Sequence, residues 1–316
     1  MASNSIKLAE GDLVRIVASA GKGSAANLPV IKAYVESLGL VADISPDIYN
    51  PDEPFYSNTD DFRAADLISA LTNDECKAIW CIRGGSGCIR LIKYLESQLP
   101  PTPPSPKVLI GYSDITVLHM YLHYKYNWPT MHGPMLESIA NGFYDPAGES
   151  VVALRSLLFN LTTLICEPVM TRLDTRGPLS PVNTQVVGGN LTLVETSIGT
   201  SWEVNATGKF LFLEDTGEAA YSIERSLDHM KQAGVFDSAA AVVFGDFTDP
   251  DSESLMTLVL QRFAGDETVT CPVFRLTGIG HGRVNFPLPL NTDATITLVD
   301  PDAQTYRLCV NNLPQK

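Results

Sequence analysis

Three apolar segments, each followed by a turn of small residues and then a helical pattern, constrain the fold of this chain most. They are residues 12–19 (DLVRIVAS, then AGKGS), 77–82 (KAIWCI, then RGGSG) and 107–112 (KVLIGY, then SDIT). Strands that alternate with helices form parallel sheets covered on both faces. We therefore expect an α/β fold, in which an N-terminal Rossmann-like domain with a parallel sheet is followed by a second, C-terminal α/β domain. A length of 316 residues suits two domains.

The pattern changes after the segment MHGPM at residues 131–135, and this change predicts the domain organisation. We expect an N-terminal α/β domain over residues 1–140 and a linker region over 141–183, where glycine and proline recur. The C-terminal α/β domain is expected over 184–316, with a second series of strands and helices. Residues 294–300 and 305–310 predict a closing β-hairpin.

Composition excludes several classes of function. A formal net charge of −14 argues against binding to nucleic acid or to an anionic membrane surface. No apolar run approaches the ~20 residues that span a bilayer, and the first 20 residues resemble a strand rather than a secretory signal, so we expect a cytoplasmic protein. The six cysteines show no CxxC spacing, so neither a disulfide framework nor a metal site is expected.

Ser113 is the candidate nucleophile, because it stands where an apolar strand gives way to a helix. The helix N-terminus offers backbone N–H groups and a partial positive charge, which suit an exposed nucleophile and a developing oxyanion. A serine N-cap followed by Asp114 in the first turn gives the same pattern without any chemistry. The segment also differs from a G-x-S-x-G elbow, because Ile115 replaces the second glycine.

A nucleophilic serine needs a base, and the chain has five histidines. His281 has the most favourable local context, because the loop GIGHGR lets the backbone approach a ligand closely. His132, in MHGPM, is a second candidate. His119 and His123 lie one helical turn apart and suit packing or solvent, whereas His229 belongs to a charged helix surface.

A carboxylate should orient the base. Glu214 ends the apolar run FLFL, and an acid at the end of a buried strand is unusual; Asp215 and Glu218 are close alternatives. The turn RGGSG at residues 83–87 leaves backbone N–H groups bare, which suits an oxyanion hole and equally suits a tight strand-to-helix turn.

A competing signal lies in the first glycine-rich turn. Residues 21–26 (GKGSAA) follow a strand and precede a helix, as in a dinucleotide fingerprint, and Asp43 lies at about the expected distance. A nicotinamide-dependent oxidoreductase is therefore the rival hypothesis. The nicotinamide hypothesis gives Ser113, Glu214 and His281 no shared function. The glycine-rich turn at residues 21–26 can also be an ordinary strand-to-helix connection that binds no cofactor.

Taken together, the segments resemble the LD-carboxypeptidase family of serine peptidases, which trim D-alanine from murein tetrapeptides. The matching stretches, in family order, are RAADLISALTNDECKAIWCIRGGSG, IGYSDIT, MHGPM, VVGGNLTLV, FLFLEDTGEAAYSIER and GIGHG. The resemblance implies a Ser113–Glu214–His281 triad and an oxyanion hole from the backbone N–H groups of Gly85 and Asp114. It also implies a site between two domains, a homodimer, a murein-peptide substrate in cell-wall recycling, and no cofactor.

Two features bear on the substrate. The family's turn usually reads RGGYG, and Ser86 replaces the tyrosine here, so any substrate contact that this ring makes in the family is absent. Related immunity peptidases hydrolyse microcin C-like aminoacyl nucleotides and carry an aromatic-bearing loop between nucleophile and acid. Trp128 and Trp202 lie in that interval but in no long inserted loop, which favours the murein peptide.

A carboxypeptidase must bind a free carboxylate. Arg83, Arg225 and Arg283 are the candidates for this contact. A non-catalytic binding protein on the same fold is a further alternative, and an unreactive Ser113 would support it.

Overall fold

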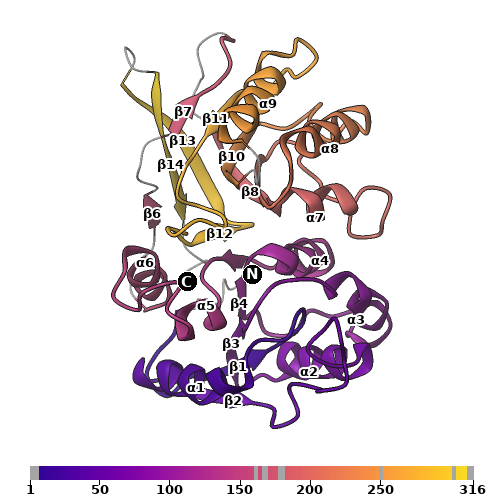
Figure 1. Ribbon diagram of the computed structural model, residues 1–316, viewed down its shortest axis with the longest axis vertical. Helices are drawn as coiled ribbons and strands as arrows, with labels where there is room; N and C mark the ends of the chain where they lie inside the picture. Colours follow the sequence, from indigo (N-terminus) through magenta and orange to yellow (C-terminus); the bar gives the residue numbers. More distant parts are fainter. Residues whose placement is uncertain are drawn as a thin grey trace.

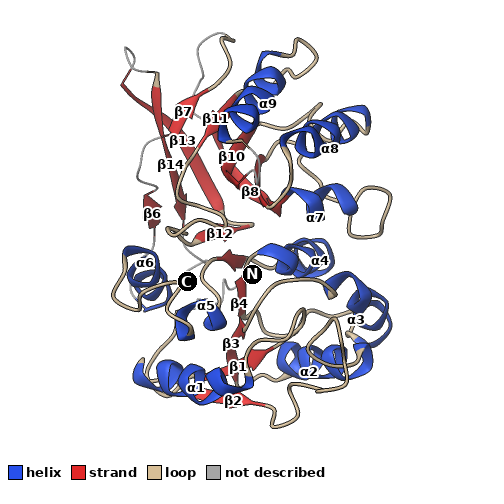
Figure 2. Cartoon of the chain, viewed as in Figure 1, coloured by secondary structure: helices blue, strands red, loops and turns tan. Residues whose placement is uncertain are grey.

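A computed structural model describes residues 7–159, 163–165, 170–176, 182–248, 252–300 and 304–311. Two sheets dominate it, one in each half of the sequence, and both are accompanied by helices (Figures 1 and 2). This arrangement confirms the predicted α/β fold with an N-terminal parallel sheet and a second α/β unit. None of the helices in these ranges has the length and apolar character needed to cross a membrane.

The elements of the first half are β1 Leu13–Val17, η1 Ala25–Asn27, α1 Leu28–Ser37, β2 Val41–Ile44, α2 Asp60–Thr72, β3 Cys76–Cys81, η2 Cys88–Leu91, α3 Ile92–Gln98, β4 Val108–Gly111, η3 Ser113–Ile115, α4 Thr116–Tyr126, β5 Thr130–His132, α5 Leu136–Ala140 and α6 Glu149–Phe159. Its sheet has the order β12-β5-β4-β3-β1-β2, and β5, β4, β3, β1 and β2 are parallel. Helices α1, α5 and α6 lie on one side of it and α2, α3 and α4 on the other (Figure 1).

The elements of the second half are β6 Thr163–Ile165, β7 Met170–Arg172, β8 Val182–Asn190, α7 Leu191–Thr196, β9 Phe210–Thr216, α8 Ala220–Gln232, β10 Ala241–Thr248, α9 Glu253–Gly265, β11 Val273–Arg275, β12 Leu288–Leu290, β13 Asp293–Asp300 and β14 Thr305–Asn311. Its sheet has the order β13-β8-β9-β10-β11-β7-β14-β6, in which β8 to β11 are parallel. The predicted hairpin is confirmed as the antiparallel pair β13–β14.

Strand β12 links the two halves, because it follows the second sheet's parallel strands in sequence yet pairs antiparallel with β5 of the first sheet, Leu288 opposite His132. Helix α6 and the strands β6 and β7 come from the stretch expected as the linker, whose residues 160–162, 166–169 and 177–181 lie outside the described residues. The chain therefore crosses between the two sheets more than once.

The strand interiors explain why the sheets form. Strand β4 is buried at every position, and β9 is buried from Phe210 to Asp215. Such strands, apolar throughout rather than alternating, are typical of parallel sheets covered on both faces. The polar residues Ser113 and Glu214 follow or end these strands. The candidate reactive side chains therefore lie at the carboxyl ends of the parallel strands.

Candidate active site

Ser113 sits on a strained turn directly after β4. Its φ of 65° is left-handed, a conformation that costs free energy for a residue that is neither glycine nor asparagine. Helix η3 begins at this residue and continues into α4. The side chain is partly exposed, although its neighbours on both sides are buried. The turn thus holds a serine hydroxyl at a helix N-terminus, as the sequence predicted.

The turn RGGSG packs against Ser113. A Cβ atom added to Gly84 would lie 2.7 Å from the Cβ and 3.0 Å from the Oγ of Ser113, so only glycine fits there. Gly85 has a φ of 114°. Neither the Gly85 nor the Asp114 backbone N–H has a hydrogen-bond partner among the described residues. Two unused donors, one next to Ser113 in the chain and one in the turn that packs on it, are therefore candidates for an oxyanion site.

The backbone N–H of Asp114 is a candidate oxyanion donor, whereas its side chain connects two turns. Its buried carboxylate accepts a 2.8 Å hydrogen bond from the N–H of Cys88, which ties the RGGSG turn to the Ser113 turn. Burial raises the pKa of this carboxyl, and the hydrogen bond from Cys88 partly offsets that effect. The two candidate donors are therefore held in one rigid unit.

Glu214 and His281 form a buried pair. The Nδ1 of His281 lies 2.7 Å from the Oε2 of Glu214, whose side chain is completely buried, and the His281 side chain is 15% exposed. Because a carboxylate accepts, Nδ1 carries the proton and donates, which leaves Nε2 unprotonated in the neutral ring. The imidazole can therefore take up a proton at its other nitrogen.

The charges of the pair shift both pKa values. Burial by itself raises the pKa of Glu214. The charge of His281, together with polar interactions with the His132 and His281 rings, outweighs burial and lowers this pKa to about 2. Burial lowers the pKa of His281, but the Glu214 carboxylate outweighs burial and raises it overall. The carboxylate stays ionised and stabilises a positive charge on the imidazole.

The loop that carries His281 is fixed by two side chains that the sequence analysis missed. Asp246, near the end of β10, accepts hydrogen bonds of 3.0 and 3.2 Å from the N–H of Gly278, and Asn285 Oδ1 accepts one of 3.1 Å from Gly280. Asp246 follows the apolar run AVVFG as Glu214 follows FLFL, and this signal could have identified it. Both side chains thus hold the backbone of the loop that carries His281.

Tyr112 connects the serine turn with the imidazoles. Its ring lies edge-on to His281, with the ring centres 4.8 Å apart, and 5.7 Å from the ring of His132. The N–H of Asn190, which is paired with Glu214 in the sheet, donates a 3.0 Å hydrogen bond to the hydroxyl of Thr116. These contacts bring the first turn of α4 and the Glu214–His281 pair into one region between the two sheets.

The other histidines are placed differently. His132 is fully buried, and its Nε2 lies 3.7 Å from Glu214 Oε1, which is longer than a hydrogen bond. Burial lowers the pKa of His119 to about 3, and its Nε2 contacts the carbonyl of Gly111. His229 is on the surface beside Glu195, whereas His123 is half-buried on α4.

Asp215 and Glu218 were the alternative acids. Among the described residues, neither forms a hydrogen bond or an ion pair with His281. Asp215 is used within the second half: it accepts from the Asn190 amide and from the N–H and hydroxyl of Thr192. Glu218 is half-buried beyond the strand. Glu214 is thus the carboxylate that orients an imidazole.

The first glycine-rich turn does not suit a dinucleotide. The carboxylate of Glu137 accepts hydrogen bonds from Ser24 N–H (3.1 Å) and from the Asn27 amide (2.8 Å) at the start of the first helical segment. A pyrophosphate needs those donors, and a carboxylate repels it. Gly21 N–H is likewise bonded, at 3.0 Å, to the carbonyl of Gly84. These contacts argue against the nicotinamide hypothesis and show that the turn supports the RGGSG loop.

Three arginines were candidates for a substrate carboxylate, and all are exposed. Arg83 precedes Gly84 and donates a 3.1 Å hydrogen bond to the carbonyl of Lys22. Arg283 lies over the ring of Phe143, 4.6 Å from its centre. Arg225 lies on α8 and contacts Ser222. Arg83 and Arg283 belong to the loops that also carry Gly85 and His281, so these two are the better placed.

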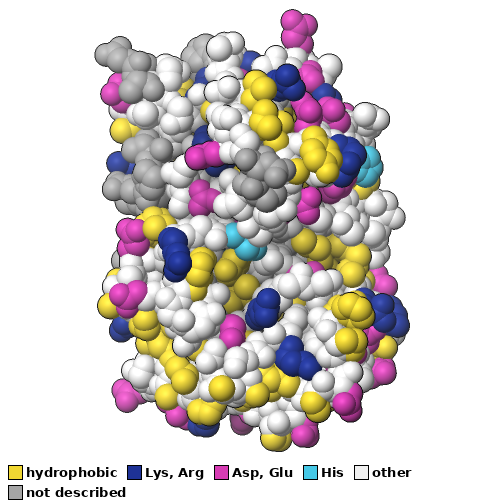
Figure 3. Space-filling model, in the orientation of Figure 1, with side chains coloured by type: hydrophobic (Ala, Val, Ile, Leu, Met, Phe, Trp, Pro, Cys, Tyr) yellow, Lys and Arg dark blue, Asp and Glu magenta, His cyan; other side chains and the backbone are white. Residues whose placement is uncertain are grey.

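The described residues contain no group of three or more His, Cys, Asp or Glu side chains that could hold a metal ion. Figure 3 shows Lys and Arg side chains scattered singly over the face in view, without a continuous basic patch. This distribution agrees with the acidic net charge of −14.

Comparisons with known proteins identify the family of this chain. Residues 14–133 match the LD-carboxypeptidase N-terminal domain, and residues 183–296 match the LD-carboxypeptidase C-terminal domain. A putative carboxypeptidase of Rickettsia conorii is 35% identical over 77% of this chain and 75% of its own length. A probable murein peptide carboxypeptidase of Bacillus subtilis is 30% identical over 94% of this chain and 92% of its own.

Solved structures share the fold. An MccF-like protein from Bacillus anthracis superposes with a TM-score of 0.81 at 21% identity, covering 96% of this chain and 98% of its own. A muramoyltetrapeptide carboxypeptidase from Oxalobacter formigenes gives 0.78 at 22%, covering 96% and 100%. The microcin C7 self-immunity protein MccF in complex with aspartyl sulfamoyl adenosine gives 0.75 at 19%, covering 96% and 97%. With both domain matches and a relative of 30% identity along nearly its whole length, this chain belongs to the LD-carboxypeptidase family.

Proposed function

We propose that this protein is a serine LD-carboxypeptidase that releases the terminal D-alanine from murein tetrapeptides during cell-wall recycling. The observation that carries the proposal is the buried Glu214–His281 pair beside the strained Ser113 turn. The family membership and the Bacillus subtilis relative, named a probable murein peptide carboxypeptidase, support the substrate class.

In the proposed mechanism, the Ser113 hydroxyl attacks the carbonyl carbon of the scissile L–D amide while His281 Nε2 takes its proton. The tetrahedral oxyanion accepts hydrogen bonds from the backbone N–H groups of Gly85 and Asp114. Its collapse breaks the C–N bond, and His281 gives the proton to the departing amine of D-alanine. Water, activated by the same imidazole, then hydrolyses the acyl-serine ester and regenerates the hydroxyl.

Glu214 has an indirect role in this scheme. Its carboxylate keeps the His281 proton on Nδ1 and stabilises the imidazolium that forms during attack. Because Glu214 is fully buried and its pKa is low, it holds a full negative charge at neutral pH. The imidazole of His132, whose Nε2 lies 3.7 Å from the other carboxylate oxygen, helps to keep the pKa of Glu214 low.

The second candidate function is hydrolysis of a microcin C-like aminoacyl nucleotide. The fold of the immunity protein MccF, solved with aspartyl sulfamoyl adenosine, favours it. The two tryptophans between Ser113 and Glu214 weigh against it, because Trp128 is 3% and Trp202 is 2% exposed. Neither indole is available to stack on a nucleobase.

Substrate profiling separates the two candidates. The purified protein would be incubated in parallel with L-Ala-D-Glu-meso-diaminopimelate-D-Ala, with the same peptide ending in L-Ala, and with aspartyl sulfamoyl adenosine. We expect release of D-alanine from the first substrate alone. Cleavage of the nucleoside conjugate with the tetrapeptide left intact would reject the murein proposal in favour of the immunity function.

We further propose a cytoplasmic homodimer with two domains, divided near residues 140 and 184. Five cysteines of the described part are free, and four of these are buried, which suits a reducing compartment. Cell fractionation tests the compartment, light scattering coupled to size exclusion tests the dimer, and limited proteolysis tests the domain division.

A further inference from the structure

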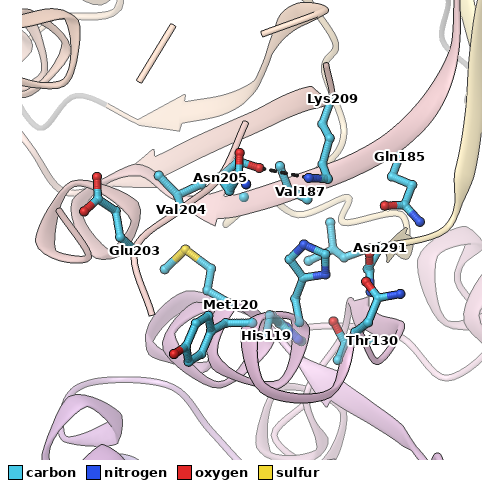
Figure 4. A pocket seen from close by; sticks show the side chains of 15 residues that line it. His119, Met120, Thr130, Gln185, Val187, Glu203, Val204, Asn205, Lys209 and Asn291 are labelled. Carbon is cyan, nitrogen blue, oxygen red and sulfur yellow. Dashed lines mark hydrogen bonds between the residues drawn. The ribbon is translucent and has the colours of Figure 1, made fainter. Parts of the chain in front are cut away.

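A cavity lies between the two halves of the molecule, lined by residues other than those of the Ser113 site. Its volume is about 350 Å³, and sites for small molecules begin at about 300 Å³. One wall is helix α4, which contributes His119, Met120 and His123, and the facing wall comes from β8 and the segment before β9 (Figure 4). None of Ser113, Glu214 and His281 lines it.

Two buried side chains that line the cavity, those of His119 and Asn291, carry hydrogen-bond acceptors without a donor. His119 is 3% exposed, and its Nε2 lies 3.0 Å from the carbonyl oxygen of Gly111. A carbonyl only accepts, so the proton of the neutral ring is on Nε2 and Nδ1 is a bare lone pair. This Nδ1 has no hydrogen-bond partner in the described part of the chain.

Asn291 supplies the second acceptor. It is 7% exposed and held in a left-handed conformation with a φ of 59°. Its amide nitrogen donates a 3.0 Å hydrogen bond to the carbonyl of Trp128, and its backbone N–H donates one of 2.7 Å to Val186. The amide is thereby oriented. Its Oδ1 accepts no hydrogen bond within the criteria among the described residues, although the neighbouring His123 imidazole interacts with this side chain. A buried polar atom without a partner is costly, so a ligand donor is the natural complement.

A cation also lines the cavity. Lys209 reaches towards the cavity, and its ammonium donates a 3.3 Å hydrogen bond to the carbonyl of Asn205 (Figure 4). No carboxylate of the described residues lies within ion-pair distance of it. The only acid lining the cavity is Glu203, which is exposed and accepts from the N–H of Gly199. Lys209 therefore offers an unpaired positive charge to an anionic group.

The walls also include apolar side chains, those of Met120, Val187, Val204 and Leu290. We propose that this cavity binds a free amino acid with an aliphatic side chain. Its ammonium donates to His119 Nδ1 and Asn291 Oδ1, its carboxylate pairs with Lys209, and its side chain packs on the apolar wall. The ligand class follows from three features of the cavity together. The cation matches a carboxylate, the two acceptors match an ammonium group, and the apolar wall matches an aliphatic side chain. The proposal does not depend on the reaction at Ser113.

Isothermal titration with leucine, in both enantiomers, tests the ligand class. We expect one saturable site per chain with a Kd of about 1 mM or tighter for at least one enantiomer. 4-Methylpentanoate, which lacks the ammonium, and leucinol, which lacks the carboxylate, should each bind at least about tenfold more weakly. Equal binding of all three compounds would reject the amino-acid assignment, as would no saturation by leucine at about 10 mM.

Two variants locate the site. Lys209→Met keeps the aliphatic stem and removes the charge, and should weaken leucine binding by about tenfold or more. Val204→Trp fills the cavity from a loop and should abolish binding. Lys77→Met is the matched control, because Lys77 is also a surface lysine bonded only to a backbone carbonyl, that of Asp74. Thermal melts establish that each variant is folded. Leucine binding that survives both cavity substitutions would overturn the proposal.

Discussion

The Nδ1 of His281 and the Oε2 of Glu214 lie 2.7 Å apart, although 67 residues separate them in the sequence and they come from different strand ends. This contact fixes the tautomer of the imidazole and directs its free nitrogen away from the buried carboxylate. It is the relationship on which the proposed mechanism depends, and it makes the following outcomes testable.

Glu214→Gln should lower kcat by about 10³- to 10⁴-fold, because an amide neither stabilises the imidazolium nor enforces the Nδ1–H tautomer. KM for the tetrapeptide should change little, since Glu214 is fully buried and cannot touch substrate. Steady-state kinetics measure both constants. Glu218→Gln is the matched control, four residues along the chain and half-buried. A Glu214→Gln enzyme with nearly full kcat would remove Glu214 from the mechanism.

The pH dependence of kcat/KM should show an acid limb governed by His281. The base works when neutral, and its pKa is raised by Glu214, so activity should fall with decreasing pH at a higher pH than an unperturbed histidine, about 6.5, would give. The Glu214→Gln variant lacks the carboxylate charge that raises the pKa of His281. The acid limb of its residual activity should therefore shift to lower pH. An identical limb in both enzymes would contradict the assignment of His281.

Gly84→Ala should lower kcat by about 10²-fold, because the new methyl group would lie 2.7 Å from the Cβ of Ser113 and displace the hydroxyl. Gly265→Ala is the control, since a Cβ there meets nothing within 4 Å. Both variants should melt cooperatively, so circular dichroism separates misplacement from unfolding. Full activity of a folded Gly84→Ala enzyme would mean that this turn does not set the position of Ser113.

Asp246→Asn should reduce kcat by about tenfold to hundredfold, because the loop around Gly278 that carries His281 loses a charged acceptor. Since Asp246 acts through the loop, the loss should fall on kcat, and the acid limb of the pH profile should broaden or move. Asp293→Asn, an exposed carboxylate on β13, should leave kcat and the pH profile unchanged. A change confined to thermal stability would limit Asp246 to a structural role.

Recognition of the terminal carboxylate should depend on Arg83 or Arg283 rather than Arg225. Loss of a charge-assisted hydrogen bond costs about 1.5–3 kcal/mol, so Arg83→Met or Arg283→Met should raise KM by about tenfold to hundredfold. Arg225→Met on α8 is the control. Hydrolysis of a tetrapeptide with an amidated C-terminus should lose this dependence. Normal KM values for both variants would direct the search to backbone donors.

The strand segments that precede Ser113 and Glu214 were predictable because long apolar runs that end at polar residues identify parallel strands locally. Strand β12 was not, because its three residues acquire a sheet only through pairing with β5, more than 150 residues away in the chain. Local sequence also suggested His281 over His132, but the burial of His132 near Glu214 is a tertiary fact. Asp246 was readable in principle from the strand AVVFGD, whereas Tyr112 gains its place only from the packing of His281 against its ring.

The central claim is that Ser113 carries out acyl transfer at the Glu214–His281 site. It is tested most directly by incubating wild type, Ser113→Ala and the neighbouring-turn control Ser86→Ala with L-Ala-D-Glu-meso-diaminopimelate-D-Ala and following the products by mass spectrometry. We predict release of one D-alanine by wild type and by Ser86→Ala, and none above background by Ser113→Ala. Release by Ser113→Ala at the wild-type rate would contradict the claim.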